Sequence, residues 1–167
     1  MIEEISNLIV DCFKGGNKVL TFGVGGNASN AIHFAGELAG KFEKYEKPLP
    51  CIDLCSNPSI LTAITNDFGW ECVFERQIKA LAKSGDVVVA FSISTSGRYL
   101  LNAIFEAVNL KCTVVLICGK CNLPDMKCHP PHIFWELDSS DTPWVQEEQL
   151  RIIHQICGKV KSRLEVD

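Results

Sequence analysis

The sequence lacks the features that would make it a membrane or nucleic-acid-binding protein. No apolar run approaches the ~20 residues that a membrane-spanning helix needs. The first residues, Met1 to Glu4, contain no cationic segment of the kind that opens a secretory leader. Positive charge is not in excess, because 16 Lys and Arg residues stand against 20 Asp and Glu residues. We therefore expect no membrane partner and no nucleic-acid partner.

Cysteine, in contrast, is plentiful. Nine cysteines, an odd number, in a chain without a recognisable leader indicate free thiols in a reducing compartment, so we expect a cytoplasmic protein. The chain has 167 residues, of which 47% are hydrophobic, and this is enough to bury one substantial core. We expect residues 1–167 to form a single domain without internal repeats or low-complexity linkers.

Two kinds of apolar segment alternate along the chain. Short continuous apolar runs, typical of strands buried on both faces of a parallel sheet, are separated by longer segments with helical spacing. Strands are expected at residues 18–22, 48–54, 86–92, 113–118 and 133–137. Helices are expected at residues 2–14, 57–65, 70–83, 98–109 and 142–163, with a further helix carrying His33 and Glu37 and a turn at 66–69. The alternation predicts a doubly wound α/β fold with a five-stranded parallel sheet.

Two turns at the carboxyl ends of expected strands are candidate anion sites. Gly23 to Gly26 joins a strand to a helix N-terminus, where free backbone N–H groups and the helix dipole favour negative charge. The segment 94–96, Ser-Thr-Ser, offers hydroxyl groups at a second helix start. Neither turn matches a nucleotide-binding motif. Together they predict a site for a phosphorylated small molecule, although a tight turn and an ordinary N-cap are the alternatives.

A candidate metal or acid–base group involves two expected helices. His33 and Glu37 lie four residues apart, so they share a helix face and can hold one metal ion. His154 lies on the apolar stripe of the last helix, where an ionisable side chain needs a partner. Gln146 precedes it by about 12 Å of helix, which is long for one ion unless the helix kinks or two subunits contribute. A structural histidine beside an exposed glutamate is the alternative.

A second candidate metal site contains Cys118, Cys121, Cys128 and His129. These residue types and the CxxC spacing suit zinc. However, Cys118 is expected to end a buried strand, and residues 128–132 form a proline-rich approach to the next strand. We leave open whether Cys118 and Cys121 bind metal.

Several ordered segments resemble the sugar isomerase (SIS) domain family, and within it the phosphoheptose isomerases. The matching segments are residues 23–29, 33–38, 66–69 and 94–97, together with Gln146 and His154. The resemblance implies an aldose–ketose isomerase that converts sedoheptulose 7-phosphate to D-glycero-D-manno-heptose 7-phosphate for bacterial surface polysaccharide. It also implies a homotetramer with active sites between subunits.

The resemblance also implies roles for individual residues. Zinc would be held by His33, Glu37, Gln146 and His154. Glu37 would be the general base and His154 the acid that move a proton between C1 and C2 through an enediol, with the metal polarising the carbonyl oxygen. The implied substrate-binding residues are Val24, Gly25, Gly26, Asn27, Ser29, Glu37, Asn66, Asp67, Ser94, Thr95, Ser96 and Gln146.

The sequence departs from the family pattern around the expected phosphate site. Val24 stands where the family usually has Asn, Asn27 where it has Ser, and Asn30 where it has Asp. At Arg98 and Tyr99 the connection into the next helix is about two residues shorter than the family's loop. A phosphate-contacting serine is therefore missing, and Arg98 could supply charge instead. The helix expected to precede the sheet is also short for the family. These departures leave the identity of the sugar phosphate open.

A non-catalytic role is the competing hypothesis. Some SIS domains only bind phosphosugars, and one relative of the phosphoheptose isomerases associates with the bacterial replication initiator. That relative lacks the catalytic pair, whereas Glu37 and His154 are both present here. The sequence therefore favours a zinc-dependent phosphosugar isomerase.

Overall fold

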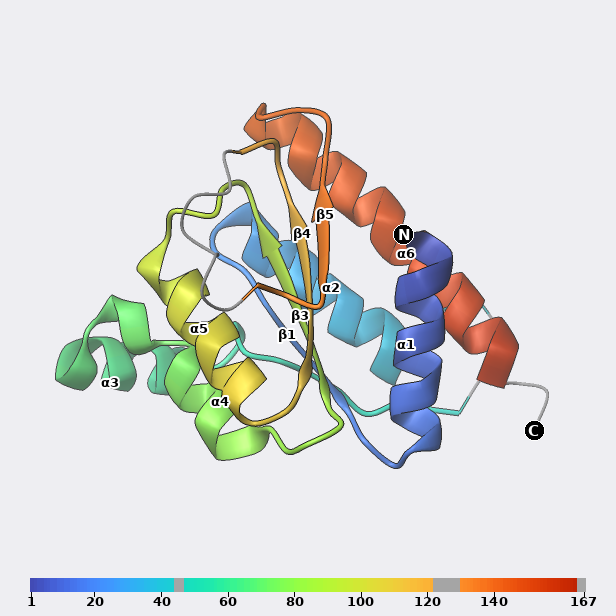
Figure 1. Ribbon diagram of the computed structural model, residues 1–167, viewed down its shortest axis with the longest axis horizontal. Helices are drawn as coiled ribbons and strands as arrows, with labels where there is room; N and C mark the ends of the chain where they lie inside the picture. Colours follow the sequence, from blue (N-terminus) through green and yellow to red (C-terminus); the bar gives the residue numbers. More distant parts are fainter. Residues whose placement is uncertain (44–46, 122–129, 165–167) are drawn as a thin grey trace.

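The computed structural model describes residues 1–43, 47–121 and 130–164, and its centre is a parallel five-stranded sheet (Figure 1). The strand order is β2-β1-β3-β4-β5, and every neighbouring pair is parallel. The strands are β1 (Val19–Phe22), β2 (Cys51–Asp53), β3 (Val87–Ser92), β4 (Thr113–Cys118) and β5 (Ile133–Glu136). This arrangement confirms the predicted doubly wound α/β fold.

Helices cover both faces of the sheet (Figure 1). They are α1 (Ile2–Lys14), α2 (Gly26–Ala39), α3 (Pro58–Phe68), α4 (Glu75–Leu81), α5 (Arg98–Asn109) and α6 (Thr142–Leu164), with a short 3-10 helix, η1, at Trp70–Cys72. Helices α1, α2 and α6 pack on one face, and α4 and α5 pack on the other. Among the described helices, each one is too short or too polar to cross a membrane.

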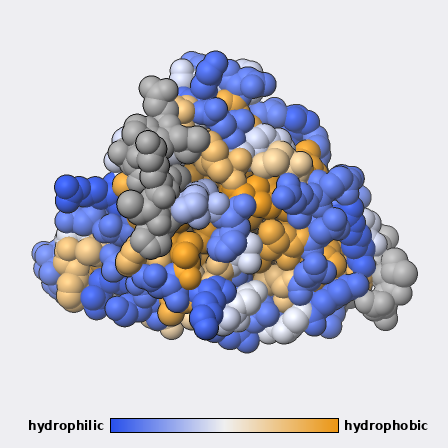
Figure 2. All heavy atoms as spheres, in the orientation of Figure 1, coloured by the Kyte–Doolittle hydropathy of each residue, from blue (hydrophilic) through white to orange (hydrophobic). Residues whose placement is uncertain are grey.

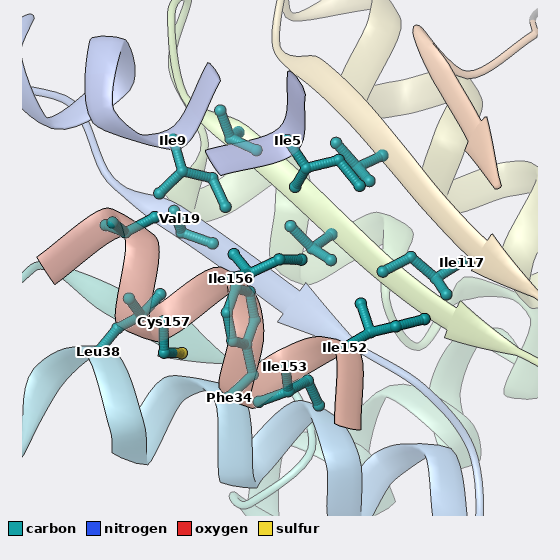
Figure 3. Packing of buried hydrophobic residues seen from close by; sticks show 14 of the residues in the cluster. Ile5, Ile9, Val19, Phe34, Leu38, Ile117, Ile152, Ile153, Ile156 and Cys157 are labelled. Atoms are coloured by element: carbon teal, nitrogen blue, oxygen red, sulfur yellow. The ribbon is translucent and has the colours of Figure 1, made fainter. Parts of the chain in front are cut away.

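Each central strand contributes alternate residues to two separate cores, as expected for a sheet covered on both faces. In β3, Val87, Val89 and Phe91 join the core beneath α1, α2 and α6, whereas Val88 and Ala90 join the core beneath α4 and α5. Figure 3 shows the first core, in which side chains from α1, α2 and α6 meet above the strands. Figure 2 shows hydrophobic residues toward the middle of one face of the molecule and hydrophilic residues along most of its rim.

Strand β2 (Cys51–Asp53) is shorter than the strand expected at 48–54, and two helical boundaries also differ from the sequence prediction. The expected turn at 66–69 is wrong, because α3 continues through Phe68 and ends at Gly69, whose φ of 91° few other residues adopt readily. The expected helix at 70–83 is broken into η1 and α4, with Val73 and Phe74 between them. Both residues are buried, so the break turns them into the core beneath α4 and α5.

A buried amide network fixes α6 against α2 and the carboxyl ends of two strands. Gln149 is fully buried, and its Nε2 donates to the carbonyl oxygens of Ser92 at 3.0 Å and Ile117 at 3.2 Å. Its Oε1 accepts a hydrogen bond from Asn30 Nδ2 at 3.1 Å. Asn30 Nδ2 also donates to the carbonyl oxygen of Gln146 at 3.0 Å. These contacts set the axial offset between α2 and α6.

Replacing Gln149 with leucine is expected to lower the free energy of unfolding by about 2–4 kcal/mol, because buried polar groups on Asn30, Ser92 and Ile117 would lose their partner. Urea denaturation of the purified variant measures the change. The matched control is Gln155→Leu on the same helix, where the half-buried amide makes no hydrogen bond to the described residues. Equal stability of the two variants would contradict a role for the network.

Candidate active site

Three ionisable side chains converge between α2 and α6. His33 Nε2 lies 3.0 Å from His154 Nε2 and 3.1 Å from Glu37 Oε1. One ligand-type atom from each residue falls within 4.8 Å of the other two, and no other group of three or more His, Cys, Asp or Glu residues does so in the described part of the chain. The helices therefore bring together the His33, Glu37 and His154 that the sequence singled out.

The three facing atoms suit a shared cation. Neutral imidazole nitrogens and a carboxylate oxygen all offer lone pairs, so their approach needs either a proton between them or a metal ion. Ligand atoms around a four-coordinate zinc ion, each about 2.0–2.1 Å from it, are separated by about 3.3 Å. The separations of 3.0 and 3.1 Å are close to this spacing. By donor type and convergence, these residues fit zinc.

The group lies at the surface of the chain, and this corrects one expectation for His154. The residue was expected to be buried on its apolar stripe, but it is exposed and lies beside the buried Ile153. One residue step turns the helix by about 100°, which moves His154 from the sheet side toward α2. The side chains of His33 and Glu37 are 40% and 20% exposed. A substrate can therefore reach the group from solvent.

Gln146 lies at the other end of the same helix pair. A Cβ atom added to Gly26 would lie 2.3 Å from Gln146 Oε1, so the amide packs directly on the start of α2. Gly26 meets Gln146, and His33 meets His154, so α2 and α6 run parallel. Gly26 precedes His33 by seven residues, or about 10 Å of helix. Because α6 is continuous from Thr142 to Leu164, Gln146 lies nearer the glycine turn than the His33 group.

The glycine turn has the backbone that an anion site needs. Gly25 is the N-cap of α2 with φ 62° and ψ −126°, a conformation that favours glycine. The Gln146 amide fills the space beside Gly26, so a side chain at this position would require that amide to move. Ser29 is exposed, whereas Val24 is half-buried. Asn27 is 4% exposed, and its Oδ1 has no hydrogen-bond partner among the described residues.

The hydroxyl segment after β3 is the second candidate anion site. Ser94 and Ser96 are exposed, and their Oγ atoms lie 3.2 Å apart, whereas Thr95 is 2% exposed. Ser92 Oγ donates to the carbonyl oxygen of Ser94 at 2.7 Å and fixes the start of the segment. In the described structure, the first turns of α2 and α5 contain no acidic residue and no side-chain cap. Both positive helix ends remain available to an anion.

Asn66 and Asp67 lie apart from these residues. They belong to α3, which packs against η1 and lies well away from α2 and α6 in Figure 1. Asn66 Nδ2 donates to Asp67 Oδ1 at 2.8 Å, and both residues are exposed. The described chain does not bring these two substrate candidates to the His33 group.

The alternative metal site is only partly described. Cys118 Sγ lies 3.8 Å from Cys121 Sγ, while Cys128 and His129 lie outside the described residues. Burial, reinforced by the neighbouring Cys121, raises the pKa of the Cys118 thiol well above its usual value. A metal site here remains a hypothesis.

The sequence reasoning missed Gln149 as a positioning residue. Its only sequence signal is a polar side chain on the apolar stripe formed by Ile152, Ile153 and Ile156. The same rule that was applied to His154, that a buried polar group needs a partner, would have identified Gln149. Asn30 was noted as a departure from a family pattern, and the structure shows that it holds Gln149 and the Gln146 carbonyl.

The SIS domain family model matches residues 1–119 of the chain. The phosphoheptose isomerase of Geobacter sulfurreducens is 38% identical over 168 residues, which covers 98% of this chain and 85% of that protein. The phosphoheptose isomerase of Aquifex aeolicus is 36% identical over 160 residues, covering 96% and 83%. A solved phosphoheptose isomerase structure from Francisella tularensis superposes with a TM-score of 0.91 at 27% identity, covering 96% of this chain and 85% of that one.

Proposed function

The chain belongs to the SIS domain family, and from that premise we propose that it converts sedoheptulose 7-phosphate to D-glycero-D-manno-heptose 7-phosphate. It is a phosphosugar isomerase of the phosphoheptose isomerase type. The observation that carries the proposed chemistry is the convergence of His33, Glu37 and His154 between two parallel helices. A carboxylate and an imidazole at one point are the groups that a proton transfer between adjacent carbons requires.

We propose Glu37 as the general base and His154 as the acid. Glu37 takes a proton from C1 of the ketose while His154 gives a proton to the C2 oxygen, which yields the enediol. His154, which has lost its proton, then takes the O1 proton while Glu37 returns a proton to C2, and this completes the aldose. Glu37 Oε1 faces His33 Nε2 at 3.1 Å, so its second carboxylate oxygen is the one assigned to the carbon-bound proton.

We propose a zinc ion as the cofactor of this site. His33, Glu37 and His154 would hold it, and the convergence of their ligand atoms supports this assignment. When bound, the ion would polarise the carbonyl oxygen next to the transferred proton. Gln146 stays in the proposal as a fourth ligand only if it approaches from a second subunit or after rearrangement, because its amide packs on Gly26.

The two anion sites are proposed to hold the phosphate end of the substrate. Gly25, Gly26, Ser94 and Ser96 present backbone and hydroxyl groups near two helix N-termini. The His33 group lies further along α2, about 10 Å from its start. In a 7-phosphate the reacting C1 and C2 lie at the opposite end of the carbon chain from the phosphate. This separation favours a long sugar phosphate over a short one.

We further propose a homotetramer in which a second copy completes each site. All residues of α3 are described, and none of them is buried. Two of its large apolar side chains, Ile60 and Phe68, are 39% and 49% exposed. A helix with this much exposed apolar surface is typical of an interface. Docked on another copy, α3 would bring Asn66 and Asp67 to a substrate site that they do not reach within one chain.

The remaining expectations are also proposals. A cytoplasmic location is supported by the eight described cysteines, which are thiols and not disulfides. A single SIS domain over residues 1–167 is supported by the one sheet and its flanking helices, which extend from Ile2 to Leu164.

Replacing Gly26 with alanine is expected to raise the KM for the sugar phosphate about tenfold, because the new methyl group would displace the Gln146 amide from the start of α2. Gly36→Ala is the matched control on the same helix, since no atom lies within 4 Å of its added Cβ. Steady-state kinetics on both variants measure the difference. An unchanged KM in Gly26→Ala would show that the Gly26–Gln146 contact does not contribute to substrate binding.

The proposed function is tested by incubating zinc-loaded protein with sedoheptulose 7-phosphate and following the aldose product by NMR. Five- and six-carbon ketose phosphates serve as competing substrates. The proposal is supported if only the heptose phosphate is converted, or if it is converted much faster than the five- and six-carbon ketose phosphates. Binding of the heptose without turnover would instead favour a non-catalytic phosphosugar-binding protein, and neither binding nor turnover would favour the initiator-associating role.

A further inference from the structure

The ring of Tyr99 lies directly on the backbone of Gly97. A Cβ atom added to Gly97 would lie 2.5 Å from Tyr99 Cε1 and 2.9 Å from Tyr99 Cζ. Gly97 is the residue that follows the hydroxyl segment 94–96 and is the N-cap of α5. The glycine thus lets an aromatic ring press against the end of a proposed phosphate-binding segment.

Tyr99 is itself held by other aromatic rings. Its ring centroid lies 6.2 Å from that of Trp70 and 6.0 Å from that of Phe74, both at tilted or edge-on angles that favour attraction. Trp70 and Phe74 contact each other at 6.2 Å, and Phe74 contacts Phe22 at 4.7 Å. These four residues, Phe22, Trp70, Phe74 and Tyr99, are called the aromatic cluster below.

The aromatic cluster connects three segments that the substrate proposal uses. Phe22 ends β1 immediately before the glycine turn, and Trp70 begins the 3-10 helix after Asn66 and Asp67. Tyr99 follows the hydroxyl segment. Phe74 is 1% exposed and contacts the other three rings, so it cannot move without disturbing all three segments.

The end of the hydroxyl segment depends on this packing. Ser92 Oγ fixes its start by donating to the Ser94 carbonyl, but Gly97 offers no side-chain cap to α5. Asn102 Nδ2 donates to the Glu71 carbonyl at 3.2 Å and joins α5 to η1 on the same side. The ring of Tyr99 therefore supplies, by contact, the restraint that a capping side chain would otherwise give.

We propose that Tyr99 is a positioning residue for substrate: its ring, clamped by Trp70 and Phe74, holds Gly97 and thereby the phosphate-binding hydroxyls of Ser94 and Ser96. The inference rests on the proposed function of that segment. Tyr99 does not touch the reacting carbons. It acts on the affinity for the phosphate group, through the order that it imposes on the unbound segment.

The test compares Tyr99→Ala, Tyr99→Leu and Tyr99→Phe in the full chain. Phenylalanine keeps the ring and is expected to keep the KM for sedoheptulose 7-phosphate within twofold of wild type. Alanine and leucine remove the flat ring and are expected to raise KM about tenfold or more while kcat changes less than threefold. Leucine retains apolar bulk, so it keeps the test available if alanine fails to fold. Phe105→Ala truncates an exposed aromatic residue on the same helix and is the control.

A double-mutant cycle with Gly97→Ala tests the contact itself. In the wild-type background the added methyl group would press against a ring that its neighbours hold in place, so we expect at least a tenfold rise in KM. In the Tyr99→Ala background the same methyl group meets no ring. We expect Gly97→Ala then to change KM less than threefold. Equal effects in both backgrounds would overturn the inference.

Binding of inorganic phosphate, followed by ³¹P NMR titration of the same variants, separates this inference from the proposed function. If the wild-type protein turns over the substrate and the KM values of Tyr99→Ala and Tyr99→Leu are unchanged, the positioning role is overturned and the proposed isomerase activity stands. No turnover by the wild-type protein refutes the proposed function. The positioning role is then decided by whether phosphate binding weakens in Tyr99→Leu and is kept in Tyr99→Phe.

Discussion

Replacing Glu37 with glutamine is expected to lower kcat by about 10²–10⁴-fold, the factor that a positioned general base contributes. Glutamine has nearly the same shape as glutamate but no carboxylate to accept the C1 proton. The side chain is 20% exposed and contacts His33 through one oxygen, so the change alters chemistry more than packing. Steady-state kinetics, with thermal unfolding of the same sample, measure the effect.

The zinc content of the Glu37→Gln protein is measured in parallel, since a lost metal would also lower turnover. Glu4→Gln, an exposed carboxylate on α1, is the matched control and is expected to behave as wild type. Wild-type turnover in Glu37→Gln would eliminate Glu37 as the base. If turnover is lost while zinc is retained, the loss is caused by the missing base and not by a missing metal ion.

Replacing His33 with alanine is expected to abolish stoichiometric zinc binding, with a Kd weaker by at least 10²-fold. His33 Nε2 is the atom that contacts both other members of the group, at 3.0 and 3.1 Å. Losing even a residue that only orients a ligand costs about 10–100-fold in metal affinity, and losing a direct ligand costs more. Elemental analysis of zinc-loaded, dialysed protein gives the stoichiometry.

His132→Ala is the matched control for the metal experiment. His132 is exposed, and its Nδ1 accepts a hydrogen bond from the Val114 N–H at 3.0 Å, so it is engaged at β4 and is not a member of the His33 group. The control protein is expected to keep one zinc ion per chain. If the His33→Ala protein still binds one zinc ion per chain, the His33 group is not the metal site, and Cys118 and Cys121 become the candidate ligands.

The sequence was most informative where the hydrophobic pattern is continuous. The apolar run at 86–92 predicts a strand buried on both faces, and it forms β3 (Val87–Ser92), with alternate residues in the two cores. The first helix ends at Lys14 because Gly15 and Gly16 follow it, as predicted. Local signals of this kind do not depend on the rest of the fold.

The two boundaries near α3 differ from the sequence prediction for different reasons. Asn66, Asp67 and Gly69 are typical turn residues, yet the first two form the last turn of a helix. The break between η1 and α4 arises because Val73 and Phe74 turn into the core. Tertiary packing decided the second case, whereas α3, which has no buried residue, runs on to its glycine C-cap at Gly69.

For the site, the sequence could identify candidate residues but not their distances. The pairing of His33 with Glu37 follows from helical spacing. Their contact with His154 depends on the parallel packing of α2 against α6, with an offset set by Gln149 and Asn30. The same offset places Gln146 against Gly26, well before the His33 group. Such an offset is a property of two packed helices and not of either sequence alone.

The central claim, that this chain moves a proton between C1 and C2 of a phosphosugar, is tested most directly by solvent exchange. Zinc-loaded protein is incubated with sedoheptulose 7-phosphate in D₂O, and the aldose is examined by proton NMR. We expect deuterium at C2 of the product, because a proton held by Glu37 can exchange with solvent before it returns to carbon. No aldose from a protein that has bound both zinc and substrate would contradict the account.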